Sequence, residues 1–80
     1  MTHRVQVYSR DGCHLCDTAI ALVDAVCAES GQAYRVIDID GQPELRSQFS
    51  DQVPVVLVDG EVIAFWRIDP QALRNALARK

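Results

Sequence analysis

The sequence has no concentration of positive charge. Eight Lys and Arg residues stand against eleven Asp and Glu residues, the formal net charge is −3, and the arginines are scattered along the chain. Such a chain produces no field that would gather nucleic acid or anionic lipid. We therefore expect neither a nucleic acid nor a membrane as its partner.

Long apolar segments are absent as well. No run approaches the roughly 20 residues that cross a bilayer, and Met1-Thr2-His3-Arg4 leads into strand-like alternation instead of the apolar stretch of a secretory signal. These features predict a cytoplasmic protein, which we expect to be a monomer. In the cytosol a permanent disulfide is unusual, so neighbouring cysteines are more often catalytic or metal-binding.

Internal repeats, linkers and low-complexity tracts are also missing. Hydrophobic residues make up 49% of the 80 residues and charged residues 24%, which is ordinary for a globular chain. We predict a single domain that spans residues 1–80.

The first half of the chain predicts a strand, a helix and a second strand. Val5 and Val7 alternate with polar residues, and Ser9-Arg10-Asp11-Gly12 then interrupts the alternation. Gly31 is suited to ending a helix, and residues 33–39 are rich in strand-forming residues. The helix between them is predicted from an apolar stripe at helical spacing: Leu15, Ala19, Ile20, Leu22, Val23 and Val26.

The second half predicts a short helix, a hairpin and a final helix. Pro43 can open the short helix. Asp59-Gly60 readily takes the positive φ angles of a tight turn between strands at 55–58 and 61–64. Asp69-Pro70 has the pattern of a helix cap followed by the first helical residue. The final helix should turn three side chains inward: Leu73, Ala76 and Leu77.

The elements follow one another as β-α-β-α-β-β-α. The first two strands are joined across a helix and should be parallel, whereas the last two form an antiparallel hairpin. The prediction is an α/β fold with a four-stranded mixed sheet flanked by helices.

The strongest chemical signal is Cys13-His14-Leu15-Cys16, where the first strand turns into the first helix. Residues three apart on a helix lie about 5–6 Å apart at Cβ, which suits a disulfide that closes and reopens. Only a thiolate attacks a disulfide, and a helix N-terminus lowers the pKa of a cysteine, so we assign Cys13 as the nucleophile. Cys16, one turn deeper on the packed side, is the resolving thiol.

Metal binding is an alternative use of such a pair. Structural zinc requires four ligands, and beyond the pair only Cys27, His3 and His14 remain, so we assign no metal ligands. Copper carriers also place Cys-x-x-Cys after a first strand, but they follow a βαββαβ plan that this chain does not share. A soft metal such as Cu(I), or an iron–sulfur cluster shared between two chains, stays open.

Several motifs in this order resemble glutaredoxins. Tyr8-Ser9-Arg10 precedes the cysteine pair, Val53-Pro54 precedes a later strand, and the Asp59-Gly60 hairpin leads to a final helix. The similarity spans essentially the whole chain and is greatest to small bacterial glutaredoxin-like proteins of the thioredoxin superfamily. It implies a thioredoxin-like (glutaredoxin-type) fold that catalyses thiol–disulfide exchange.

The resemblance also implies roles outside the cysteine pair. It implies a cis Val53-Pro54 bond beside the cysteines, with the Val53 backbone pairing with an extended substrate or glutathione; the alternative is that Pro54 only starts a strand. Arg10 stands where the family has a lysine that holds a glutathione carboxylate, and its alternative is a solvated loop cation. From its own chemistry, His14 is expected to stabilise the Cys13 thiolate or pass protons, or else to be a plain exposed residue.

The chain departs from the family pattern at two places. Glutaredoxins carry Pro-Tyr between the cysteines, where this chain has His14-Leu15. They carry Gly-Gly after the hairpin, where this chain has Ala64-Phe65 followed by Trp66-Arg67. Side chains at the second place would crowd a tripeptide, which argues against efficient glutathione-dependent catalysis.

Three further residues have two readings each. Trp66 either shapes a substrate groove or seals the sheet edge. Asp69 matches an acidic residue that binds the glutathione amine, although helix capping accounts for it. Cys27 shares a helix face with Cys16, and we expect it to pack in the core rather than act in redox chemistry.

We therefore predict a glutaredoxin-like thiol–disulfide oxidoreductase that needs no bound cofactor. Reduced Cys13 attacks a disulfide on a protein or a small thiol, and Cys16 then attacks Cys13 and releases the reduced product. An external reductant, glutathione or another thiol, restores the dithiol. The alternatives are a soft-metal or iron–sulfur binding module that uses the same thiolates, and an interaction domain without turnover.

Overall fold

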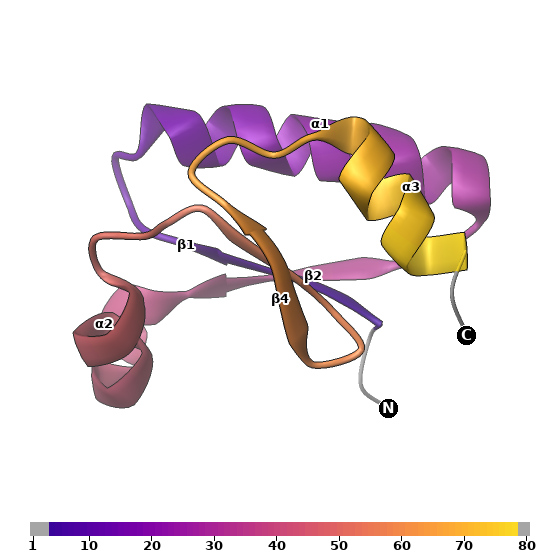
Figure 1. The fold of residues 1–80 in the computed structure, drawn as a ribbon. Helices are drawn as coiled ribbons and strands as arrows, with labels where there is room; N and C mark the ends of the chain where they lie inside the picture. The colour runs from indigo at the N-terminus through magenta and orange to yellow at the C-terminus, as the bar shows by residue number, and fades with distance from the viewer. Residues whose placement is uncertain (1–3, 79–80) are drawn as a thin grey trace.

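The computed structural model describes residues 4–78, which form four strands and three α-helices in the predicted order, with one added 3-10 turn (Figure 1). The elements are β1 (Val5–Ser9), α1 (His14–Ser30), β2 (Tyr34–Asp38), the 3-10 turn η1 (Ile39–Gly41), α2 (Pro43–Phe49), β3 (Val55–Val58), β4 (Glu61–Phe65) and α3 (Pro70–Ala78). His3, considered above as a metal ligand, lies outside the described residues. Across residues 4–78, no helix has the length and apolar character needed to span a membrane.

The strands form one mixed sheet in the order β2-β1-β3-β4. β1 runs parallel to β2 and antiparallel to β3, and β3 and β4 form the antiparallel hairpin. Val7 of β1 stands opposite Val36 on one side and Val56 on the other. Both predicted pairings, the parallel one across α1 and the hairpin, are confirmed.

Residues with positive φ make the two predicted turns. The N–H of Gln32 donates to the Cys27 carbonyl at 2.9 Å across Gly31, which ends α1 with a φ of 69°. In the hairpin, Asp59 has a φ of 54° and Gly60 a φ of 84°. Glycine adopts these angles without a steric penalty, and aspartate tolerates them better than most residues do.

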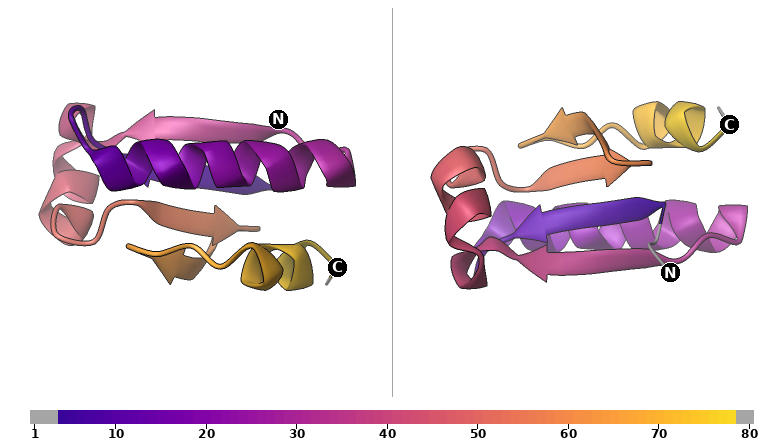
Figure 2. Two further views of the ribbon diagram at one scale, coloured as in Figure 1. Left: turned by 90° about the horizontal axis from the view of Figure 1, so that it is seen from above. Right: turned by 90° about the horizontal axis from the view of Figure 1, so that it is seen from below.

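Two helices cover one face of the sheet. Figure 1 shows α1 and α3 side by side over the strands, whereas the view from below in Figure 2 shows the opposite face with only α2 at one end. The side chains between the helices and the sheet form the core: Val5, Val7, Val23, Val26, Cys27, Val56, Val58, Leu73 and Ala76. The expectation that Cys27 is a core residue is therefore confirmed.

One position of the apolar stripe predicted for α1 is wrong. Leu15 is 54% exposed, whereas its neighbour Cys16 is 1% exposed. Successive helical residues point about 100° apart, so Leu15 turns sideways once Cys16 faces the sheet. The residues of α1 that the structure buries are Cys16, Ala19, Val23, Val26 and Cys27.

The second strand is shorter than the predicted 33–39. It ends at Asp38, whose carboxylate accepts a hydrogen bond from the N–H of Asp40 at 2.9 Å and so begins the 3-10 turn. Ile39, predicted as the last strand residue, is instead fully buried as the first residue of that turn.

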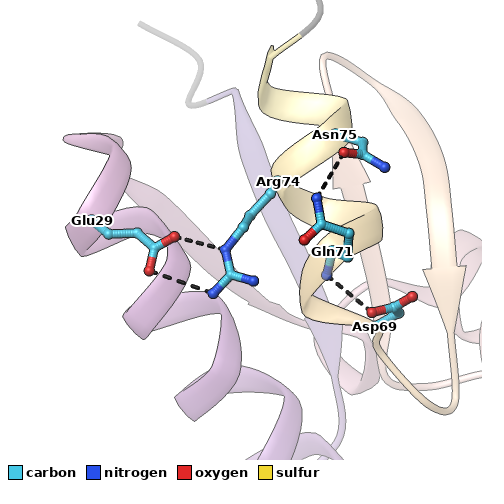
Figure 3. Close-up of polar contacts among 5 residues, drawn as sticks. All are labelled: Glu29, Asp69, Gln71, Arg74 and Asn75. Atoms are coloured by element: carbon cyan, nitrogen blue, oxygen red, sulfur yellow. Dashed lines mark hydrogen bonds and ion pairs between the residues drawn. The ribbon is translucent and has the colours of Figure 1, made fainter.

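Polar contacts hold α3 at its place beside α1 (Figure 3). The Arg74 guanidinium donates to the Glu29 carboxylate at 2.7 Å. At the start of α3 the Asp69 carboxylate accepts from the N–H of Gln71 at 3.0 Å, which leaves Pro70 as the first helical residue. The capping reading of Asp69 is confirmed.

Replacing Leu73 by Ala is expected to lower the free energy of unfolding by about 2–5 kcal/mol, because it leaves a cavity under α3 where the leucine is fully buried. Arg74→Ala on the same helix is the matched control. It removes only an exposed ion pair with Glu29 and should lower the free energy of unfolding much less. Urea unfolding measures both changes, and equal losses would contradict the packing of α3 described here.

Candidate functional site

Cys13 is the N-cap residue of α1. Its backbone is extended, and its Sγ accepts a hydrogen bond from the N–H of Cys16 at 3.2 Å. The sulfur thus occupies the position that a serine or aspartate oxygen takes at many helix N-termini. This arrangement directs an N–H that has no partner within the helix at the Cys13 sulfur.

The two sulfurs of the motif differ in access to solvent. Cys13 is partly exposed, whereas Cys16 is 1% exposed, and both are free thiols. Burial, together with a hydrogen bond to Cys13, raises the pKa of the Cys16 thiol to about 11. An incoming disulfide can therefore reach Cys13, and Cys16 is held beneath it as a protonated thiol at neutral pH.

The peptide bond between Val53 and Pro54 is cis, as the resemblance implies. Pro54 is buried, and Val53 is half-buried with a backbone N–H and carbonyl that make no hydrogen bond within the described part of the chain. Val53 lines the same open groove as Leu15, which lies between the two cysteines. The fold therefore brings the residue before the proline next to the cysteine motif.

Trp66, which follows β4, forms another wall of this groove. The groove has a volume of about 570 Å³, and its lining consists of Leu15, Asp51, Val53, Phe65, Trp66 and Arg67. Trp66 is 53% exposed and lines this groove, and its role toward a substrate stays a prediction. Sequence reasoning placed Leu15 in the core and gave Phe65 no role beyond crowding, and no local signal marks either as a groove residue.

Arg10 lies in a different hollow from Val53. Its Nε donates to Oδ1 of Asp40 at 3.0 Å, and the Nε of Arg46 approaches the same oxygen at 3.9 Å. This hollow of about 520 Å³ shares no lining residue with the groove. No local pattern marks Asp40 as the partner of Arg10, because the two residues lie thirty positions apart.

His14 is the first residue of α1 and is exposed. Its carbonyl accepts from the Thr18 hydroxyl at 3.4 Å, and its imidazole makes no hydrogen bond to either cysteine. From Arg4 to Ala78, no three His, Cys, Asp or Glu side chains gather closely enough to hold a metal ion.

The strand order, the cysteine motif at the start of α1 and the cis-proline before β3 together define an α/β protein with a thioredoxin-type fold. A family model described as "Glutaredoxin-like domain (DUF836)" matches residues 4–78. The chain belongs to this glutaredoxin-like family.

Several proteins of known sequence or structure are similar to this chain. The Mycobacterium tuberculosis protein Rv0508 is 35% identical, over 95% of this chain and 84% of that protein. Protein Ne2328 from Nitrosomonas europaea is 30% identical over 94% of this chain and 91% of its own, with a TM-score of 0.77. Thioredoxin 1 from Thermosipho africanus shares the fold, with a TM-score of 0.66 over 94% of this chain and 90% of its own at 19% identity.

The buried Cys16 thiol predicts a loss of stability at high pH. Its pKa is raised from 9.0 to about 11 in the folded protein, so between these values the unfolded chain loses the proton and the folded chain retains it. The contribution of this thiol to the free energy of unfolding is fully present below pH 9. The free energy of unfolding should fall by about 2–3 kcal/mol as the pH rises toward 11. Urea unfolding under reducing conditions at both ends of this range measures the fall.

Cys16→Ala is the matched control for this pH dependence. In this variant the free energy of unfolding should decrease much less between pH 9 and pH 11. Cys27 and Tyr34, whose pKa values burial also raises, should account for the decrease that remains. A variant with the same pH dependence as the original protein would show that Cys16 does not ionise on unfolding in this way.

Proposed function

We propose that this protein is a thiol–disulfide oxidoreductase that works through Cys13 and Cys16. The observation that carries the proposal is the arrangement of the two sulfurs: Cys13 is accessible at the start of α1 and accepts the N–H of a buried Cys16. Membership of a glutaredoxin-like family supports it. The alternative of a metal-binding module has no comparable observation in its favour.

The proposed reaction has two exchange steps. The Cys13 thiolate attacks one sulfur of a substrate disulfide, and the other sulfur leaves as a thiolate that takes up a proton. Cys16 then gives up its proton and attacks the Cys13 sulfur, which releases the second substrate thiol and forms the Cys13–Cys16 disulfide. The substrate gains two electrons and the protein dithiol loses two, so an external thiol must restore the dithiol.

The high pKa of Cys16 suits the first step, because Cys16 stays protonated and does not compete while Cys13 waits for a substrate. The second step requires Cys16 to lose that proton, because only a thiolate attacks a disulfide. The half-buried backbone of Val53, which has unpaired polar groups beside the groove, is the proposed support for the substrate chain. We place this reaction in the cytoplasm, with the protein acting as a monomer.

Replacing Cys13 by Ser should reduce the exchange rate to that of the uncatalysed reaction, because the attacking sulfur is gone. Cys16→Ser should retain the first step and accumulate a mixed disulfide with the substrate, which mass spectrometry detects as an added mass that a reductant removes. Cys27→Ala is the control and should exchange normally, because Cys27 is buried in the core. Failure of Cys16→Ser to form an adduct with any disulfide would show the assigned roles to be wrong.

We propose that Arg10 binds a carboxylate of glutathione. We propose that His14 stabilises the Cys13 thiolate or passes protons. The ion pair with Asp40 competes with a glutathione carboxylate for the Arg10 guanidinium. Asp40→Asn should therefore lower the KM for glutathione as the reductant, and Arg10→Gln should raise it, each by about threefold, which corresponds to roughly 0.7 kcal/mol. A steady-state assay measures both, and a KM unchanged in both variants would remove Arg10 from the site.

A further inference from the structure

The segment between β4 and α3 is tied to the loop that contains the cis-proline. The backbone N–H of Trp66 donates to the Pro54 carbonyl at 2.9 Å, and its indole Nε1 donates to the Asp51 carbonyl at 2.7 Å. Trp66 therefore contacts both ends of the 51–54 segment, in which Val53 lies. Its φ of 65° is unusual for a bulky residue, and such a conformation persists only where surrounding contacts hold it.

This anchoring leaves a group of large apolar side chains in solvent. Leu15 is 54% exposed, Phe65 45% and Trp66 53%, and the rings of Phe65 and Trp66 meet edge to face with centroids 5.4 Å apart. All three line the groove beside Val53. Contiguous apolar side chains that are exposed on a protein surface often mark a binding site.

The apolar surface continues along α1. A second hollow of about 290 Å³ shares Leu15, Trp66 and Arg67 with the groove and extends it along α1: its remaining lining residues are Thr18, Ala19, Leu22 and Ile68. Figure 1 shows the segment after β4 running along α1. The α1 residues that line the second hollow all belong to the half of the helix that carries the cysteines.

The groove also has charged residues in its lining. Arg67 lines both hollows, and its guanidinium makes no hydrogen bond or ion pair with any of residues 4–78. Asp51 is the other charged residue of the groove, and Trp66 binds its backbone carbonyl and not its carboxylate. The groove thus offers apolar walls, one cation and one carboxylate.

We infer that the surface lined by Leu15, Phe65, Trp66 and Arg67 selects polypeptide disulfides over glutathione disulfides. An extended client segment lies along Val53, with an aromatic or aliphatic side chain near its cysteine between Leu15 and Trp66, and with a carboxylate at Arg67. Glutathione brings several charged groups and no large apolar side chain to these walls. The inference rests on the proposed exchange reaction and names its substrate class.

The test uses nine-residue peptides whose central cysteine is capped with β-mercaptoethanol through a disulfide. One peptide has phenylalanine beside the cysteine and an aspartate two positions further on, and its partners carry serine for the phenylalanine or asparagine for the aspartate. Glutathione capped in the same way is the small substrate, so the leaving thiol is identical throughout. Single-turnover rates are measured with the protein reduced beforehand.

The original protein should react with the phenylalanine peptide at least tenfold faster than with the serine peptide or with capped glutathione. Leu15→Ser and Trp66→Ala should each remove most of that preference, measured as the ratio of the rate with the phenylalanine peptide to the rate with capped glutathione. Val62→Ser is the matched control, because Val62 is 41% exposed on β4 and lines neither hollow. Arg67→Gln should remove the preference for aspartate over asparagine only.

A binding experiment separates this inference from the exchange reaction. Trp66 is the sole tryptophan, so its fluorescence reports on the groove when a peptide with serine in place of cysteine is added. The groove assignment is supported if the phenylalanine peptide binds and if Leu15→Ser, but not Val62→Ser, weakens this binding. If the peptide binds in this way but no disulfide exchange occurs, the groove assignment holds and the proposed function is wrong. Equal rates for all substrates, or equal effects of Leu15→Ser and Val62→Ser, overturn the groove assignment.

Discussion

The packing of α1 on the sheet determines where both sulfurs of the site lie. The buried face of the helix, which includes Val23 and Cys27, rests on the valines of β1 and β3. This contact fixes the rotation of the helix about its axis, and that rotation buries Cys16 and leaves Cys13 at the accessible end. The raised pKa of Cys16 has burial as its main cause, so the chemical difference between the two thiols follows from the same contact.

The two loops at the site depend on each other in a similar way. Trp66 holds the segment before β3 through hydrogen bonds to Asp51 and Pro54, and this segment presents Val53 beside the cysteine motif. The apolar walls of the groove and the proposed support for a substrate backbone are therefore parts of one structure. Trp66 both ties the two loops together and lines the groove.

The ion pairs of the protein lie around this framework without forming it. Arg74 with Glu29 and Arg10 with Asp40 are exposed pairs, for which small contributions to stability are typical. Their effect is local: the first helps set α3 beside α1, and the second gives the Arg10 guanidinium a partner of its own.

The sequence by itself determined the order of the elements, the turns at Gly31 and Asp59-Gly60, the cap at Asp69 and the placement of the cysteine pair at a helix start. These features depend on local propensity and on residues a few positions apart, which a sequence displays directly. Only the tertiary structure decided that Leu15 faces solvent, that Asp40 pairs with Arg10 and that Trp66 joins two loops. Each of these contacts joins segments distant in the chain, or follows from the rotation of one helix on the sheet, and neither leaves a local pattern.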